Sequence, residues 1–278
     1  MGSMTTGTGL RPAAAPLTRR QRLRDATSEE IKTVARDLMA RDGTASLNLR
    51  AIAREMGMTP SALYRYYPSR DAILTALITD AYDSVGEAVE RAIDEAREDQ
   101  ACTPILAGVH TFRRWALEHP QEYGLIYGSP VPGYEAPEEA TMGPAMRTSL
   151  ALLELLRRAI GKGMLTLPPD DSVPEGLRPL FDGLAEQKSH VVEIQPLAAT
   201  GWAIAMQFWV VLHGILSAEV FGHLPRELRE QGEAFFDFTI RQALIAIGVD
   251  RAVVAASVSP QPQITATQIT ATQITPGG

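Results

Sequence analysis

The 278-residue chain has a single cysteine, Cys102, which excludes an intramolecular disulfide and a metal site built from several cysteines. This scarcity is typical of proteins of the reducing cytoplasm. No uninterrupted apolar run approaches the roughly 20 residues that a membrane span needs. Residues 1–16 also lack the apolar core of a signal peptide. We therefore expect a cytoplasmic protein without a membrane partner.

Sequence patterns of the common enzyme classes are missing as well. The chain has no phosphate-cradling glycine loop, no nucleophile elbow, and no histidine or cysteine spacing typical of a metal site. Its five histidines are scattered from position 110 to position 223. The adjacent carboxylates Glu138 and Glu139 fall in a segment that looks exposed. We therefore expect no enzyme activity, no cofactor and no metal.

Strand-like alternation is absent too, and helical periodicity runs through most of the chain. The first full helix is predicted over residues 27–41, because Thr27 and Glu30 have capping-box spacing before an apolar stripe that starts at Ile31. Residues 161–200 carry five prolines and predict a long irregular connection with a helical fragment near 176–195. The fold class is therefore all-α.

A short stretch near residue 50 has the most informative pattern. Leu49, Ile52, Ala53 and Met56 lie at helical spacing, and Asn48 before them is a good N-cap. These residues predict a short amphipathic helix.

A second short helix is expected directly after it. Gly57 suits the left-handed turn that ends the first helix, and Thr59 with Pro60 starts the next. Pro68 ends that second helix, whose other positions are mostly polar or aromatic. Two helices around a glycine turn predict a helix-turn-helix, whose second helix can enter a major groove of DNA.

Charge is distributed unevenly along the chain. The net charge of −7 speaks against a nucleic-acid binder. However, residues 1–75 hold 12 Lys and Arg against 7 Asp and Glu, a balance of +5, whereas the remainder holds 14 against 26, a balance of −12. The positive part coincides with the predicted helix-turn-helix, as expected for a phosphate-binding surface.

The helix-turn-helix also has a family resemblance. Ala51-Ile52-Ala53, Gly57 and the run from Leu63 to Leu74 (LYRYYPSRDAIL) resemble the N-terminal DNA-binding domain of TetR-family transcriptional regulators. Arg70 stands where that family usually has lysine, and both side chains can hold a phosphate. The resemblance implies a three-helix DNA-binding domain followed by a helical bundle for ligand binding and dimerisation.

The resemblance also implies which side chains touch DNA. Phosphate contacts are expected from Tyr64, Arg70, Thr44 and the N-cap end around Asn48, and base contacts from residues at the start and along the second helix. Arg65 is the best single candidate, because a guanidinium can contact guanine O6 and N7 together. Tyr66 is equally compatible with packing, and Tyr67 is expected to pack. The full expected set is Thr44, Asn48, Arg50, Thr59, Pro60, Ser61, Tyr64, Arg65, Tyr66 and Arg70.

The C-terminal part has a sparser resemblance. The stretch Tyr123–Gly128 (YGLIYG) with Trp209, His213 and Gly214 is similar to the TetR C-terminal subclass named for tryptophan, histidine and glycine. A small apolar or aromatic effector is expected in a pocket there, although each candidate residue is also compatible with simple core packing. The candidates are Phe112, Trp115, Tyr123, Tyr127, Met146, Leu153, Trp209 and His213.

Two C-terminal helices are expected to form a homodimer. Residues 199–221 are apolar nearly all round, so one stripe of this helix could pack into its own body and another against a second copy. Residues 228–247 place Phe236, Ile240, Ala243 and Ile247 at spacing typical of a helix–helix seam. Meeting their symmetry mates, the two helices would form a four-helix interface.

The expected domains follow from these patterns. They are a disordered arm (1–18), the helix-turn-helix domain (19–74), the ligand-binding and dimerisation domain (75–250) and a low-complexity disordered tail (251–278) that repeats Gln-Ile-Thr-Ala-Thr. Four arginines between positions 19 and 24 are either a solvated helix start or a flexible arm that touches phosphate or a minor groove.

The preferred function is a dimeric repressor released from a pseudo-palindromic double-stranded DNA operator by a small molecule. One alternative is a DNA-binding dimer with a filled core, which responds to a protein partner or to nothing. A third reading is a scaffold whose DNA-binding head is vestigial.

Overall fold

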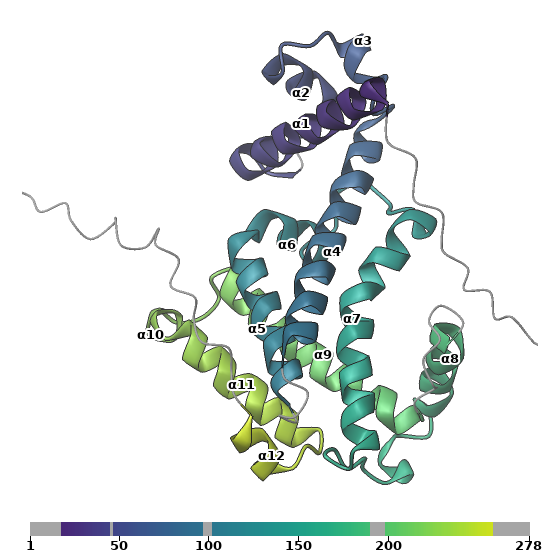
Figure 1. Ribbon diagram of the computed structural model, residues 1–278, viewed down its shortest axis with the longest axis vertical. Helices are drawn as coiled ribbons and strands as arrows, with labels where there is room; N and C mark the ends of the chain where they lie inside the picture. The colour runs from purple at the N-terminus through teal and green to yellow at the C-terminus, as the bar shows by residue number, and fades with distance from the viewer. Residues whose placement is uncertain (1–17, 45–46, 97–101, 190–197, 258–278) are drawn as a thin grey trace, which may run out of the picture. The chain divides into compact units, whose positions relative to one another are not determined.

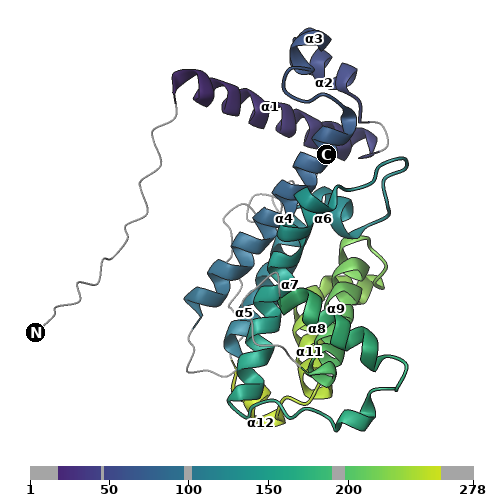
Figure 2. The same cartoon turned by 90° about the vertical axis from the view of Figure 1, so that its right-hand side faces the viewer.

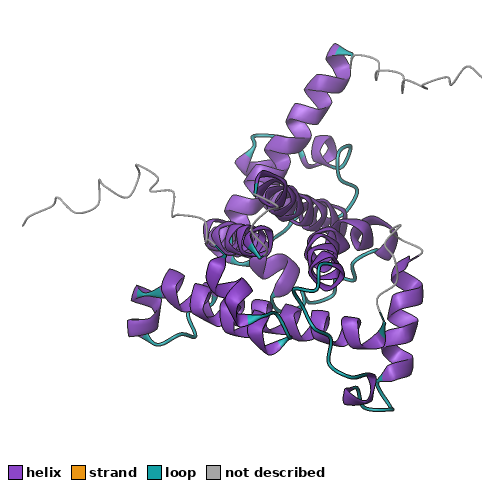
Figure 3. Cartoon of the chain, turned by 60° about the horizontal axis from the view of Figure 1, so that its bottom comes forward, coloured by secondary structure: helices purple, strands orange, loops and turns teal. Residues whose placement is uncertain are grey.

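The computed structural model describes residues 18–44, 47–96, 102–189 and 198–257. These residues form helices and loops without a strand, apart from an isolated bridge between Leu165 and Val249 (Figure 3). The predicted all-α fold is confirmed. The greater part of the expected N-terminal arm and the Gln-Ile-Thr-Ala-Thr repeats lie outside the described residues.

The chain divides into two compact units between Leu74 and Thr75. The first unit holds three helices and the start of a fourth, and its core includes Ile31, Ile52 and Leu63, all fully buried. The helices are α1 (Arg19–Asp42), α2 (Leu49–Glu55), α3 (Pro60–Leu63) and α4 (Arg70–Glu95), and α4 continues into the second unit (Figure 1).

Helix α1 begins two turns earlier than the sequence indicated. Thr18 is its N-cap, and a reciprocal capping box joins Thr18 to Gln21. Thr27 lies inside the helix, where its hydroxyl donates to the Leu23 carbonyl oxygen at 2.9 Å. The arginine segment is therefore helical, which corrects the interpretation of a flexible arm. The first two turns of α1 bury no side chain, so the apolar stripe starts only at Ile31. An apolar stripe that starts there favours the Thr27–Glu30 capping box, and the predicted start of the helix is therefore too late.

The turn between α2 and α3 forms through the residues that the sequence indicated. The Asn48 side chain accepts from the Ala51 amide at 2.8 Å, and the Thr59 hydroxyl accepts from the Ala62 amide at 3.3 Å. Gly57 has φ of 62°, a backbone conformation that side chains disfavour. Helix α3 itself is shorter than expected, but its turn continues through hydrogen bonds from the Tyr66 and Tyr67 amides to the Leu63 carbonyl.

The second unit is a helical bundle. Its central helix α9 runs obliquely across α5 and α7, and α8 packs against α9 (Figures 1 and 2). The remaining helices of this unit are α5 (Thr103–Glu118), α6 (Pro120–Tyr127), α7 (Glu138–Gly161), α8 (Arg178–Ser189), α9 (Ala199–Val220), α10 (Arg226–Glu230), α11 (Gly232–Ala246) and α12 (Arg251–Ala256).

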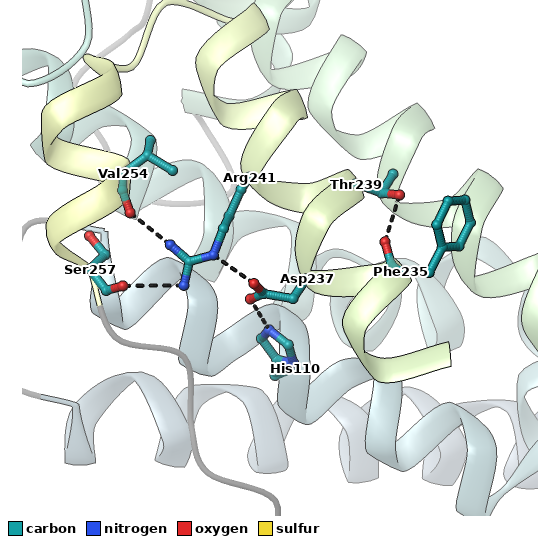
Figure 4. A network of polar contacts seen from close by, with 7 residues as sticks. All are labelled: His110, Phe235, Asp237, Thr239, Arg241, Val254 and Ser257. Carbon is teal, nitrogen blue, oxygen red and sulfur yellow. Dashed lines mark hydrogen bonds and ion pairs between the residues drawn. The ribbon is translucent and has the colours of Figure 1, made fainter. Parts of the chain in front are cut away.

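One helix of this unit was predicted and another was not. The helical fragment expected near 176–195 is present as α8 at residues 178–189, whereas residues 251–256 of the expected disordered tail form α12. Figure 4 shows what holds α12: the Arg241 guanidinium donates to the Val254 and Ser257 carbonyls at 2.7 and 3.2 Å. Asp237 bridges Arg241 to His110 of α5. The local sequence of α12 did not reveal these long-range contacts.

The seam expected on α11 packs inside the protomer. Phe236, Ile240, Ala243 and Ile247 are all buried within the second unit, so they do not offer a surface to a second copy. The large apolar residue that α11 exposes is instead Phe238, at 59% exposure.

Helix α9 combines buried and exposed apolar faces. By length and composition alone it is apolar enough to cross a membrane, although polar residues interrupt its apolar run. It packs against α5, α7, α8 and α11, as the core helix of a helical domain does. Its other face exposes Met206, Val210 and Val211, with Val210 at 65% exposure.

Candidate DNA interface and effector site

Most of the residues expected to touch DNA lie on the exposed surface of the helix-turn-helix. Arg50 projects from α2, and Tyr64 at the end of α3 is half exposed. Thr44, Tyr66 and Arg70 are partly buried. The exposed members of the set are Asn48, Arg50, Thr59, Pro60, Ser61, Tyr64 and Arg65.

The tyrosines that follow α3 differ in their surroundings. The Tyr67 hydroxyl lies 2.8 Å from the Ser28 hydroxyl of α1, so this residue fastens the segment after α3 to the first helix. The Tyr66 ring lies under the Arg24 guanidinium, 6.0 Å from its centroid. Tyr64 is free of such packing and presents its ring to solvent.

Arg70 has a structural role that the sequence did not reveal. Its Nε donates to the Leu47 carbonyl at 3.0 Å and its Nη2 donates to the Thr44 carbonyl at 3.3 Å. The first turn of α4 thereby holds the chain on either side of residues 45–46, just before the N-cap of α2.

An aromatic cluster forms where α5, α6 and α9 meet in the second unit. The His213 ring lies 4.2 Å from Trp209 and 4.4 Å from Tyr127, measured between ring centroids. Phe112 contacts both Tyr127 and His213, at 5.8 and 5.6 Å. Together with Tyr123, these are five of the eight residues predicted for the effector pocket, and the fold brings them together.

Two polar atoms in this cluster are buried without a hydrogen-bond partner among the described residues, namely Tyr127 Oη and His213 Nε2. The neighbouring Tyr123 hydroxyl, in contrast, lies 3.0 Å from the Ser217 hydroxyl. Burial raises the pKa of Tyr127 well above its ordinary value and lowers the pKa of His213 to about 4. Both side chains are therefore neutral at physiological pH, and each can form a hydrogen bond that the fold leaves unmade.

The other three pocket candidates lie outside these ring contacts. Trp115 donates from its indole nitrogen to the Ser84 hydroxyl at 3.0 Å and stacks on His119. Leu153 is buried in α7, and Met146 is partly buried there.

The sequence missed two rings that contact the cluster. Phe221, directly after α9, lies 5.9 Å from Tyr123, and the other ring is Tyr82 of α4. Its ring meets Tyr127 edge-on at 5.8 Å, and its hydroxyl donates to the Ile126 carbonyl at 3.2 Å. Only a pairing of α4 with α6, which no local pattern encodes, could have indicated it.

The structure also outlines an open groove of about 1050 Å³ in the second unit. It lies between the 166–177 segment, α8, α9 and α11, and its walls are mainly apolar. None of the eight predicted pocket residues lines it.

Within the described ranges, no group of three or more His, Cys, Asp and Glu side chains is arranged to hold a metal ion. Arg113 and Glu219 form a salt bridge between α5 and α9, and His110 Nε2 of α5 lies at hydrogen-bond distance, 3.0 Å, from Asp237 Oδ1 of α11. Neither pair is part of the aromatic cluster.

Comparison with protein families identifies both units. Residues 31–77 match the model of bacterial regulatory proteins of the tetR family. Residues 105–243 match the model of the tetracyclin repressor-like C-terminal domain.

Individual relatives agree with these matches. The HTH-type transcriptional regulators Rv1816 of Mycobacterium tuberculosis and Mb1846 of Mycobacterium bovis are each 32% identical over 229 residues, covering 82% of this chain and 95% of theirs. The crystal structure of the regulatory protein SCO4313 aligns with a TM-score of 0.63 at 32% identity, covering 82% of this chain and 99% of that one. The SmeT–triclosan complex shares the fold at 18% identity, with a TM-score of 0.56 over 85% of this chain and 98% of that one.

These relatives are regulators of transcription and not enzymes. The helix-turn-helix geometry, the positive N-terminal unit and the two family matches converge: the chain belongs to the TetR family of DNA-binding transcriptional regulators.

Proposed function

We propose that this regulator is a cytoplasmic homodimer that represses transcription and leaves a pseudo-palindromic operator when a small aromatic molecule binds its C-terminal bundle. The observation that carries the effector part is the pair of unpartnered polar atoms in the aromatic cluster, Tyr127 Oη and His213 Nε2. Buried polar groups nearly always have hydrogen-bond partners, so such a pair is typical of a site that a ligand completes.

The effector class follows from the same residues. Aromatic walls favour a flat apolar ligand, and a phenol-like hydroxyl could donate to His213 and accept from Tyr127. The SmeT structure, which shares this fold, contains triclosan.

The alternative of a filled core also has support. The ring centroids of the cluster lie only 4.2–6.5 Å apart, and none of its members lines the groove described above. Under that alternative the dimer responds to a protein partner or is not regulated by a ligand.

Dimerisation is proposed through the exposed stripes of α9 and α11. Met206, Val210 and Val211 on α9 and Phe238 on α11 are exposed in the protomer, and α9 packs against α11. An exposed apolar stripe on α9 with an exposed aromatic ring on the adjacent α11 is typical of a surface that a second copy covers.

Helix α4 is proposed to carry the response from the bundle to the DNA-binding unit, since it is continuous from Arg70 to Glu95. In the bundle, Arg147 of α7 donates to Glu90 at 2.6 and 2.8 Å and pairs with Asp83 at 3.4 Å. Its side chain lies against Gly86 of α4, so closely that a Cβ there would come within 2.7 Å of Arg147 Cδ. A movement of α7 would therefore be transmitted directly to α4.

On the DNA side, we assign base contacts to Arg50, Thr59, Ser61, Arg65 and Tyr66, and phosphate contacts to Tyr64, Thr44 and the Asn48 end of α2. Arg70 already donates to two carbonyls, so we propose that it mainly positions α2.

Arg65→Ala is expected to weaken operator binding by about 1–3 kcal/mol and to relax specificity at one base pair, because a bidentate contact to guanine is lost. The measurement is selection of bound duplexes from a random pool, followed by titration of the recovered operator.

Tyr64→Phe serves as the matched comparison, because it removes a single hydroxyl expected to contact phosphate. It should weaken all duplexes nearly equally. If Arg65→Ala leaves both the affinity and the selected sequence unchanged, the assignment of Arg65 to base contacts is wrong and the vestigial-head reading gains support.

The effector proposal is tested with a panel of hydroxylated aromatic compounds that includes triclosan. A compound that binds the cluster should raise the melting temperature of the wild type and release it from the operator. Tyr127→Phe should keep the fold and reduce affinity for that compound about tenfold, because one hydrogen bond is lost.

Tyr123→Phe is the control for this variant, because the Tyr123 hydroxyl is already paired with Ser217 and should not contribute to effector affinity. If no compound of the panel shifts the melting temperature, the filled-core alternative is favoured.

A further inference from the structure

The first two turns of α1 project from the first unit without support from its core. Residues 18–26 are all exposed, and the first buried side chain of the helix is Ile31. The Thr18–Gln21 capping box, and not burial, fixes where the helix starts. The exposed side chains of Arg19 and Arg20 are therefore accessible to another molecule.

These turns carry charge that is unfavourable within the helix. Arg19 and Arg20 lie in the first turn, where the helix dipole disfavours cations, and that turn has no acidic residue. Within the described part of the chain, no carboxylate pairs with Arg19 or Arg20. An anion from outside the protomer would offset the unfavourable helix dipole and would supply the negative partner that these arginines lack.

A cleft of about 610 Å³ opens between these turns and the segment around α3. No acidic side chain lines it. Two of its walls carry opposed arginines, Arg19, Arg20 and Arg24 from α1 and Arg65 from the segment after α3. Because Arg65 and Tyr66 also belong to the proposed base-reading set, the cleft adjoins the DNA-contacting surface.

The helical conformation decides which part of DNA the cleft can take. An α-helix with its side chains is about 10–12 Å across, whereas the minor groove of B-DNA is only about 6 Å wide. An extended arm could enter that groove, but the two helical turns cannot. A sugar–phosphate backbone fits an open cleft lined by arginines.

We propose that this cleft receives the phosphate backbone beside each operator half-site, with Arg19 and Arg20 contacting phosphates and Arg24 holding the Tyr66 ring in place. The proposal rests on DNA binding by the helix-turn-helix and adds a sequence-independent contact to it. Each protomer would then grip its half-site through α3 in the major groove and through the start of α1 on the flanking backbone.

The test compares the double variant Arg19→Gln/Arg20→Gln with the wild type on an operator recovered by selection from random duplexes. Two lost phosphate contacts in each protomer, and therefore four in the dimer, should make the slope of log affinity against log salt less steep by about 3.6. The dissociation constant near physiological salt should rise about tenfold or more, equally for duplexes that differ in flanking sequence. The hydroxyl-radical footprint should shorten at both outer edges.

Two further variants complete the design. Arg226→Gln/Arg251→Gln removes the same charge from exposed positions of the second unit and should leave the salt slope unchanged. Arg19→Lys/Arg20→Lys should restore most of the wild-type slope, because phosphate binding requires charge more than guanidinium geometry. The melting temperature of the Gln variant should match the wild type, since both side chains are exposed.

An unchanged salt slope in Arg19→Gln/Arg20→Gln would overturn the proposal. A loss confined to A·T-rich flanks would also overturn it, in favour of minor-groove reading. In both cases the wild type and the Arg226→Gln/Arg251→Gln control still bind the operator. If the wild type itself binds no duplex preferentially, the assignment of α3 as the base-reading element is wrong, and so is the proposal that the cleft receives the phosphate backbone.

Discussion

Val210→Glu is expected to convert the dimer into a monomer and to weaken operator binding by a factor on the order of 10² or more. Val210 is the most exposed apolar residue of α9, at 65%. A carboxylate there would have to be buried against its counterpart in the second copy, near the two-fold axis of the proposed interface. Two helix-turn-helix units would then bind DNA independently, and the gain from their linkage would be lost.

Sedimentation velocity and operator titration measure the two parts of this prediction. Leu117→Glu is the matched control, because Leu117 is a partly exposed residue of α5, at 39%, outside the proposed interface. That control should stay dimeric and bind normally. A Val210→Glu protein that remains dimeric would show that the exposed stripes of α9 and α11 do not form the interface.

Arg113→Met is expected to destabilise the bundle by about 3–5 kcal/mol, because it leaves the Glu219 carboxylate buried without its partner. The Arg113 and Glu219 side chains are 15% and 9% exposed, and Arg113 Nε donates to Glu219 at 2.8 Å. Arg113 also covers the face of Phe236, 5.6 Å from its centroid. This pair joins α5 to α9, which is one of the two helices of the proposed interface.

Chemical denaturation of the two single variants and their combination measures the effect. Glu219→Leu alone should be about as costly, whereas Arg113→Met with Glu219→Leu should recover much of the loss, since no unpaired charge remains. The exposed pair Arg226–Glu230 is the comparison, with side chains 80% and 60% exposed. Arg226→Ala should change stability by less than about 1 kcal/mol. Equal effects at the two pairs would contradict the role assigned to burial.

The helix-turn-helix could be predicted nearly complete, because its determinants are local. Asn48 and Thr59 each cap a helix by accepting from the amide three residues further on, and Gly57 supplies the one backbone conformation that the turn requires. The predicted start of α1 was wrong, and the reason is local as well. Thr18 with Gln21 and Thr27 with Glu30 both have capping-box spacing, and only the first is used.

The candidate sites were predicted less completely. Five of the eight pocket residues meet in the aromatic cluster, but they come from two distant parts of the chain, the consecutive helices α5 and α6 and the later helix α9, and Tyr82 joins them from α4. Arg70 was expected on phosphate, yet it donates to carbonyls that lie 23 and 26 residues away in sequence. Such long-range partners leave no periodic signal.

The sequence by itself determined the all-α class, the helix-turn-helix and the family, since caps, a glycine turn and apolar spacing act over a few residues. Only the tertiary structure decided which apolar stripe is buried. Phe236 and Ile240 face the protomer core, whereas Val210 and Phe238 are exposed. The sequence of a helix that is apolar on several faces does not specify which face packs against its own bundle, because burying any of these faces yields a similar hydrophobic free energy. Packing against the other helices of the bundle determines which face is buried.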